Sequence, residues 1–242
     1  SVVYANHSWG SYHWSRTANP FALKLGDNVS TAWDAYIAET ASDWSQSSVL
    51  DTMVVAGSNA NPKNCKPKSG RVEACSAKYG FNGWLGLAQI WVSGSHITQG
   101  VAKMNDSYFN TATYNTPPWR RLVMCQEIAH AFGLDHQDEN FSNPNLGTCM
   151  DYTNDPDGPL SNEHPNAHDY TQLETIYGHA DSSTTVSAAF SPQTKNDIEE
   201  EDLSEPSAWG KALHRDGRGR PSLHERDLGH GNKVFTFVLW AN

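Results

Sequence analysis

Met-Cys-Gln-Glu-Ile-Ala-His-Ala-Phe-Gly-Leu-Asp-His, residues 124–136, is the stretch that decides the fold of this chain. It predicts a helix that ends at Gly133, because glycine readily adopts the positive φ that terminates a helix and reverses the chain. Gln126 and His130 are four residues apart, so they share one face of that helix. We therefore interpret the stretch as a helix and a tight turn that gather polar side chains.

The turn is expected to bring four chemically different side chains together. It would carry His136 back towards His130, beside Gln126 and Glu127. Two imidazoles, a carboxylate and an amide converge in this way around a catalytic zinc ion. The competing interpretation is a polar helix end without a metal. We disfavour it because Glu127 and Gly133 both fall in register with the histidines.

The stretch resembles the metzincin zinc-endopeptidase motif H-E-x-x-H-x-x-G-x-x-H, written here as Q-E-I-A-H-A-F-G-L-D-H. Gln126 stands where the family has a histidine, and the other fixed positions match. Residues 147–152, Gly-Thr-Cys-Met-Asp-Tyr, resemble the methionine-containing turn of the same family. The spacing of Met150 and Tyr152 is similar to that of astacins and serralysins. The resemblance implies that Met150 packs beneath the metal without ligating it.

The resemblance also implies an activity, that of a zinc endopeptidase. Gln126, His130 and His136 would hold the zinc, which lowers the pKa of a bound water. Glu127 would be the general base that accepts the proton of that water. Tyr152 would donate a hydrogen bond to the developing oxyanion, and its alternative role is that of an ordinary core tyrosine.

Gln126 is the departure from the family that leaves the function open. An amide oxygen is neutral and harder than imidazole, so it is a poorer zinc ligand. Three outcomes follow: Gln126 ligates through Oε1, a water or a remote side chain fills the position, or the site is inactive. The inactive case would be a secreted binding protein, a pseudoprotease. We favour the active enzyme because Glu127, Met150 and Tyr152 are all present.

Composition limits the partners of the chain. It has 242 residues, of which 38% are hydrophobic and 18% charged, and its net charge is −10. The acidic balance argues against nucleic acid and anionic membrane as partners, and no apolar run is long enough to span a bilayer. Proteins or peptides are the expected substrates of an expected monomer. Asp155 and Asp157 could bind calcium, although a solvated turn is the alternative that we prefer.

The cysteines favour an oxidising compartment. An even number, Cys65, Cys75, Cys125 and Cys149, indicates two disulfides. We expect Cys65–Cys75 to close a short loop and Cys125–Cys149 to join the active-site helix to the Met turn. Buried thiols and a cysteine metal site are the alternatives, and no C-x-x-C spacing supports the second. Because the chain begins at Ser1 without methionine, we expect a processed, secreted protein.

The remaining pattern predicts an α+β fold. Helical spacing of Trp33, Ile37 and Trp44 predicts a helix that backs the sheet, and Ser30 or Thr31 is its expected N-cap. The spacing of apolar residues and the apolar content predict strands at residues 21–25, 49–56, 84–92 and 96–104. The intervening segment 57–77 is interpreted as a loop.

Three regions are expected along the chain. Residues 1–182 would form a metzincin-like catalytic domain: a twisted mixed sheet, the backing helix, the active-site helix, the Met turn and a C-terminal helix that begins at Pro165. Residues 183–206 read as an acidic linker. Residues 207–242 read as a small β-hairpin extension. Its apolar run 234–240 is expected to pack on the catalytic domain or within the hairpin.

The resemblance also suggests how a substrate would bind. In that family the lower-edge strand of the sheet binds the substrate backbone as an added antiparallel strand. Here residues 86–90 or 96–104 are expected to have that role.

Overall fold

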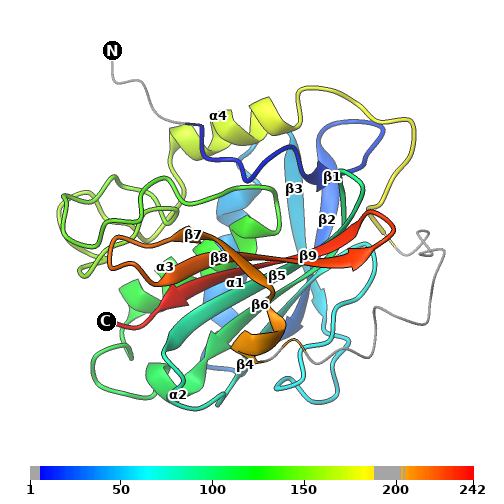
Figure 1. Cartoon of the computed structure of the whole chain (residues 1–242). Coiled ribbons are helices and arrows are strands. Elements are labelled where there is room, and N and C mark those ends of the chain that lie inside the picture. Colours follow the sequence, from blue (N-terminus) through cyan, green and yellow to red (C-terminus); the bar gives the residue numbers. More distant parts are fainter. Residues whose placement is uncertain (1–5, 188–202, 204) are drawn as a thin grey trace.

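The computed structural model describes residues 6–187, 203 and 205–242, and it has an α+β fold built on one mixed sheet (Figure 1). The elements in chain order are β1 (His13–Trp14), β2 (Phe21–Asn28), α1 (Asp34–Trp44), β3 (Leu50–Ala56), β4 (Val72–Ala77), β5 (Trp84–Ser93), β6 (His96–Asn105), α2 (Asp106–Phe109), α3 (Pro117–His130), α4 (Ala167–Ile176), the 3-10 turn η1 (Pro206–Ala208), β7 (Lys211–Arg215), β8 (Pro221–Gly229) and β9 (Asn232–Trp240).

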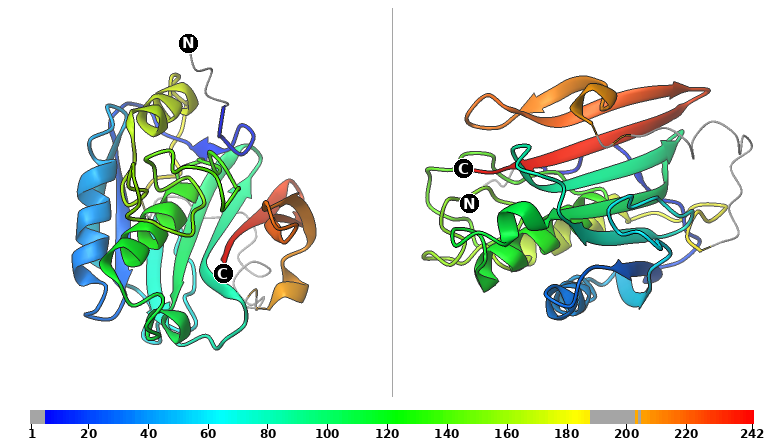
Figure 2. Two further views of the ribbon diagram at one scale, coloured as in Figure 1. Left: turned by 90° about the vertical axis from the view of Figure 1, so that its left-hand side faces the viewer. Right: turned by 90° about the horizontal axis from the view of Figure 1, so that it is seen from below.

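The sheet places distant parts of the chain side by side. Its strand order is β3-β2-β4-β6-β5-β9-β8-β7, and β1 pairs with the start of β6. The β3, β2, β4 and β6 strands are parallel to one another, whereas β5 is antiparallel to β6, and the pairs β5–β9, β9–β8 and β8–β7 are antiparallel as well. The α1 helix packs on β3, α3 packs on β5 and β6, and the two helices contact each other. Figure 2 shows α1 and the β7–β9 strands at opposite ends of the sheet.

The β5 strand is the centre of the fold, and its sequence explains why. Its residues are buried from Trp84 to Val92, as expected of a continuous apolar run covered on both faces. One face packs against the main core, which includes Ile90 and the α3 residues Val123 and Ile128. The opposite face contributes Trp91 to a smaller cluster with Val234 of β9.

The expectation that residues 86–90 or 96–104 border an open cleft is wrong for this structure. The β6 strand lies between β4 and β5, and β5 lies between β6 and β9. Neither strand therefore has an open edge. The physical reason is the apolar run of β9, which buries itself by pairing with β5 along almost the whole of that strand.

Residues 57–77 are more ordered than predicted. The expected loop ends in β4, whose Glu73 is fully buried. A charged residue at a core position hides the strand pattern, and here it is accommodated by an ion pair with Arg71. The predicted disulfide Cys65–Cys75 is confirmed and joins the loop to β4. The second predicted disulfide, Cys125–Cys149, is confirmed as well.

Two helix starts differ from the prediction. Trp33, and not Ser30 or Thr31, is the N-cap of α1, and its side chain makes no capping hydrogen bond. The α4 helix begins two residues after Pro165. Its N-cap is Asn166, whose side chain accepts hydrogen bonds from the backbone of the first turn in a capping box.

The C-terminal residues join the main sheet. Residues 211–240 form β7, β8 and β9, and β9 extends the sheet from β5. Most of the acidic segment 183–206 lies outside the described residues. In the part of the chain that is described, no helix has both the length and the apolar character needed to cross a bilayer.

Candidate metal centre

The predicted helix and turn are present, but α3 ends at His130, and residues 131–133 already belong to the turn. Pro117 and Pro118 occupy the first turn of α3, where a proline costs no hydrogen bond. Gly133 has a φ of +100°, and a Cβ atom there would lie 2.8 Å from the carbonyl oxygen of Tyr12. Both the backbone conformation and the close approach therefore require glycine. The turn brings the ring of His136 to 4.5 Å from that of His130, centroid to centroid.

Both imidazoles are fixed in one tautomer. His130 Nδ1 lies 2.8 Å from the carbonyl oxygen of Leu134, and His136 Nδ1 lies 2.7 Å from Glu139 Oε1. These oxygens accept hydrogen bonds, so each Nδ1 carries a proton, and Nε2 is the ring nitrogen left to bind a metal. Neither Nε2 has a hydrogen-bond partner among the described residues. Imidazoles that bind metals are held in this manner.

Gln126 is oriented by the backbone of the Met turn. Its Nε2 donates to the carbonyl oxygen of Cys149 at 2.8 Å, and its side chain is fully buried. Because the carbonyl must accept, Nε2 faces Cys149 and Oε1 faces away from it. The Oε1 atom has no partner within the described part of the chain. The Cys125–Cys149 disulfide joins the residue before Gln126 to the residue whose carbonyl Gln126 contacts, and so it keeps α3 and the Met turn together.

Glu127 lies directly against β5. A Cβ atom added at Gly86 would meet Glu127 Oε1 at 2.4 Å, so glycine makes room for the carboxylate. Burial raises the pKa of Glu127 well above its usual value. Burial also lowers the pKa of His130 well below its usual value, and the neighbouring His136 lowers it further. In this environment both groups favour their uncharged forms, and a divalent cation nearby would favour the carboxylate instead.

These residues fit a divalent metal. Gln126 Oε1, His130 Nε2, His136 Nε2 and both Glu127 carboxylate oxygens are buried with no hydrogen-bond partner in the described structure. Each such atom costs about 1–3 kcal/mol when it is left unsatisfied. Imidazole nitrogen and side-chain oxygen are donors that zinc accepts. A metal held by Gln126, His130 and His136 accounts for three of these atoms and leaves Glu127 beside it.

The Met turn buries Met150 and brings Tyr152 to the ring of His136. Met150 is fully buried, and its N–H donates to Thr148 Oγ1 at 3.0 Å. The ring of Tyr152 lies 4.5 Å from that of His136. Burial first, and then the carboxylates of Glu139 and Glu127, raise the pKa of Tyr152 well above its usual value. The phenol therefore keeps its proton and remains a hydrogen-bond donor.

The C-terminal strand β9 closes the centre. The ring of Phe237 stacks on that of His130, with 4.0 Å between centroids and 9° between planes. The hydroxyl of Tyr152 donates to the carbonyl oxygen of Val238 at 3.2 Å. His130 and Glu127 are consequently 0% exposed. Sequence reasoning missed this cover, although the apolar run of β9 signalled that the strand needed a buried position.

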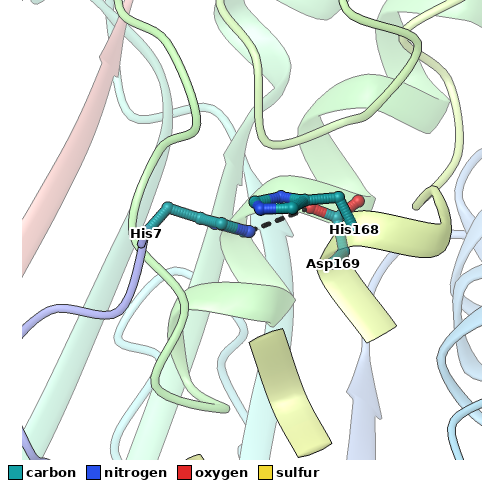
Figure 3. Close-up of side chains that lie close together, drawn as sticks. All are labelled: His7, His168 and Asp169. Atoms are coloured by element: carbon teal, nitrogen blue, oxygen red, sulfur yellow. Dashed lines mark ion pairs between the residues drawn. The ribbon is translucent and has the colours of Figure 1, made fainter. Parts of the chain in front are cut away.

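A second group of side chains, His7, His168 and Asp169, lies close together between the N-terminal segment and α4 (Figure 3). Asp169 accepts hydrogen bonds from Thr148 Oγ1 at 2.5 Å and from the backbone of Asn166 at 2.7 Å. His7 Nε2 lies 3.4 Å from the other carboxylate oxygen of Asp169. His7 Nδ1 lies 2.9 Å from the carbonyl oxygen of Asp135, beside the His136 loop. The group thus joins the N-terminal segment, α4 and the Met turn.

Asp155 and Asp157, the expected calcium ligands, do not belong to any cluster of metal-ligating side chains found among the described residues. Among the described residues, three sets of metal-ligating side chains have their ligand atoms within 4.8 Å of one another, and none includes Asp155 or Asp157. Calcium binding by these two residues stays a prediction.

Several solved structures match the chain in fold at distant sequence, and two of them are described here. No protein-family model and no curated protein matches the chain. One structure is high choriolytic enzyme 1, a hatching-enzyme zinc protease from Oryzias latipes. It is 12% identical over 70% of this chain and 96% of its own, with a TM-score of 0.40. The other is myroilysin, 13% identical over 71% of this chain and 98% of its own, with a TM-score of 0.39. Neither similarity assigns this chain to a family.

Proposed function

We propose that this chain is a secreted zinc endopeptidase whose active centre is held closed by its own C-terminal strand. The observation that carries the proposal is the set of buried lone pairs on Gln126, His130 and His136, which have no partner among the described residues. Buried polar atoms are normally satisfied, so three on one helix and turn point to a common ligand. The two disulfides agree with an oxidising compartment.

The side chains around the centre suit peptide-bond hydrolysis. Bound zinc would supply a Lewis acid and a water of lowered pKa. Glu127, buried beside the ligands, would accept the proton of that water and pass it to the leaving amine. Tyr152 would donate its hydroxyl hydrogen bond to the developing oxyanion. The apolar surroundings exclude bulk water and so strengthen both interactions.

The position of β9 explains how the closed state would work. Extended peptides commonly bind by adding a strand to an exposed sheet edge. The β9 strand occupies that edge of β5, antiparallel, from Asn232 to Trp240. Tyr152, the proposed oxyanion donor, already donates to the carbonyl oxygen of Val238. The chain's own strand therefore lies where a substrate would lie, and it must leave before a substrate can enter.

A specific observation favours a second function. The centre is fully buried, and Gln126 is a weaker zinc ligand than the histidine it replaces in the resembling motif. A permanently closed site would leave a non-catalytic, extracellular binding protein. The experiment must therefore distinguish a closed enzyme from an inactive one.

The test removes the ring that covers His130. Phe237→Ala should weaken the hold of β9 on the centre, because β9 then loses the ring that stacks on His130, while the chain stays intact. Phe235→Ala is the matched control: it lies two residues earlier on the same face of β9 and packs on Trp9 and Tyr12. Each change is expected to cost about 3–5 kcal/mol of stability. Metal content and hydrolysis of a fluorescent casein would be measured for both variants and for the native chain.

The expected result is zinc-dependent hydrolysis by Phe237→Ala at a rate well above that of Phe235→Ala. A chelator should abolish it, and added zinc should restore it. Zinc binding without hydrolysis in the opened, folded variant would support the binding protein. Absence of zinc from all three proteins would contradict both the proposed metal centre and the proposed peptidase activity.

A further inference from the structure

Four ligand-type side chains converge at a second place, away from the centre of α3. His13 is in β1, His96 is the first residue of β6, and His179 and Asp181 follow α4. His13 Nε2 and His96 Nε2 each lie 3.4 Å from Asp181 Oδ1, and His179 Nε2 lies 3.7 Å from it. His179 Nε2 also lies 3.2 Å from His13 Nε2. Three imidazoles thus face one carboxylate oxygen.

The backbone sets these positions before any ligand binds. His13 is directly opposite His96 in the parallel pairing of β1 with β6, so both side chains project to the same side. The Asp181 N–H donates to the carbonyl oxygen of Arg16 at 2.9 Å. Arg16 returns a backbone hydrogen bond and a guanidinium hydrogen bond to Asp181 Oδ2, at 3.1 and 2.6 Å. Arg16 thereby engages one carboxylate oxygen and leaves the other facing the rings.

His13 is held so that one ring nitrogen faces Asp181. Its Nδ1 lies 2.8 Å from the carbonyl oxygen of Ser11, which can only accept, so Nδ1 carries a proton. A carbonyl partner on the remote ring nitrogen is the usual arrangement of a metal-ligating histidine.

Three of the distances match the edges of a small tetrahedron. Zinc binds imidazole nitrogen at about 2.0–2.1 Å and carboxylate oxygen at about 2.0–2.2 Å, so adjacent ligand atoms lie about 3.3–3.5 Å apart. The distances among His13 Nε2, His179 Nε2 and Asp181 Oδ1 are 3.2, 3.4 and 3.7 Å, and the ligand atoms of these three residues lie within 4.8 Å of one another. We propose that His13, His179 and Asp181 form a second metal site, which takes zinc and joins β1 to the segment after α4, with His96 beside Asp181 at the start of β6.

A stabilising role follows from the positions of the ligands. The site joins a segment near the beginning of the chain to the segment after α4, so binding should stabilise the folded state by mass action. The alternative is a metal-free network in which His96 and His179 donate protons to Asp181 and His13. The experiment has to separate these two cases.

The test uses the full chain and two partly exposed histidines, the proposed ligand His179 and the neighbouring His96, whose side chains are 50% and 34% exposed. The double variant His96→Ala/His179→Ala removes one ligand and the imidazole beside it without opening the core. His230→Asn is the matched control: it removes an exposed histidine from a turn, and asparagine tolerates the positive φ of that position. A fourth protein, His136→Ala, impairs the other centre only.

Metal-free samples of the four proteins would be titrated with zinc by calorimetry, and thermal unfolding would be followed with and without zinc. The double variant should bind one zinc fewer than the native chain and His230→Asn. It should also lose a zinc-dependent rise in the unfolding temperature. Cobalt should give the intense visible absorption of a tetrahedral site in His136→Ala and no such band from this site in the double variant.

The outcomes also separate this site from the peptidase centre. If the native chain binds one zinc that His136→Ala keeps and the double variant loses, this site stands and the centre on α3 fails. If the double variant binds as many zinc ions as the native chain, with the same thermal shift, the metal-free network is correct and the proposal is wrong.

Discussion

Gln126 decides how tightly the candidate centre on α3 holds its metal. Its Nε2 is committed to the carbonyl oxygen of Cys149, so only Oε1 remains as a ligand atom. An imidazole is a softer and better zinc ligand than an amide oxygen. Gln126→His should therefore tighten zinc binding, by about tenfold or more, which is about 1.4 kcal/mol. Competition with a chromogenic chelator would measure the change.

A matched pair makes that prediction specific. Gln126→Ala removes the ligand oxygen and should weaken zinc binding, in the opposite direction from Gln126→His. If both variants bind zinc as the native chain does, the third ligand lies elsewhere.

Glu127 has a role that can be separated from metal binding. Its carboxylate is fully buried against Gly86, and it is not one of the proposed ligands. Glu127→Gln keeps the shape of the side chain and removes the base. In the Phe237→Ala background it should lower the rate of casein hydrolysis by about 10²–10⁴-fold.

Zinc content is the control for that variant, and it should remain that of the parent protein. Unchanged hydrolysis by Glu127→Gln with zinc bound would mean that another group is the base.

At the level of elements, the two disulfides are predicted to act differently on the centre. Cys125–Cys149 joins α3 to the Met turn, and the carbonyl of Cys149 orients Gln126. Cys65–Cys75 joins a surface loop to β4. Removing either should cost about 2–5 kcal/mol of stability. Only the double change Cys125→Ser/Cys149→Ser should also weaken zinc binding, because the backbone carbonyl of residue 149, which orients the Gln126 amide, is then no longer fixed by the disulfide.

Urea unfolding and zinc titration of both double variants would check this difference. Equal zinc affinity in the two would show that the turn holds its shape without the disulfide.

In β4, Glu73 predicts a dependence of stability on pH. Burial alone would raise the pKa of Glu73, but hydrogen bonds from Arg71, Asn28 and Ser58 outweigh it, and the net pKa is lowered. A lowered folded pKa stabilises the protein above the unfolded value of about 4.5, and this contribution is lost as the pH falls through the folded pKa. Glu73→Gln should therefore be less stable than the native chain at pH 7.

The difference in the free energy of unfolding should shrink as the pH falls below 4.5, where the native carboxyl becomes neutral like the amide. Urea unfolding at several pH values would measure it, with Glu174→Gln on the exposed face of α4 as control. A difference that is constant with pH would mean that the ion pair with Arg71 does not shift the equilibrium.

Elements that depend on local chemistry were predictable from the sequence, and those that depend on distant pairing were not. Helical spacing and one glycine were enough to predict α3, its turn and the approach of His136 to His130. The β4 strand was hidden because buried Glu73 reads as a loop residue until its partner is known. The stacking of Phe237 on His130 depends on strand pairing across the sheet, which no local pattern contains.

On the scale of the whole molecule, the sheet itself controls access to the centre. The β9 strand pairs with β5 on one side and with β8 on the other, so the C-terminal strands continue the sheet beyond the centre. Figure 1 shows β9, in red, along β5. The β5 edge can accept a substrate only if β9 separates from β5, and separation within the β8–β9 hairpin is not required. The two pairings therefore have different consequences for activity.

A reversible crosslink would test that difference. Gln89 and Thr236 are opposite each other in the β5–β9 pairing, so Gln89→Cys/Thr236→Cys could form a disulfide that locks β9 on β5. In the Phe237→Ala background, the oxidised protein should bind zinc and have little peptidase activity, and mild reduction should restore the rate. The control, Asp227→Cys/Lys233→Cys, crosslinks β9 to β8 only, and its activity should be the same in both redox states. Full activity of the locked protein would show that substrate reaches the centre without displacing β9 from β5.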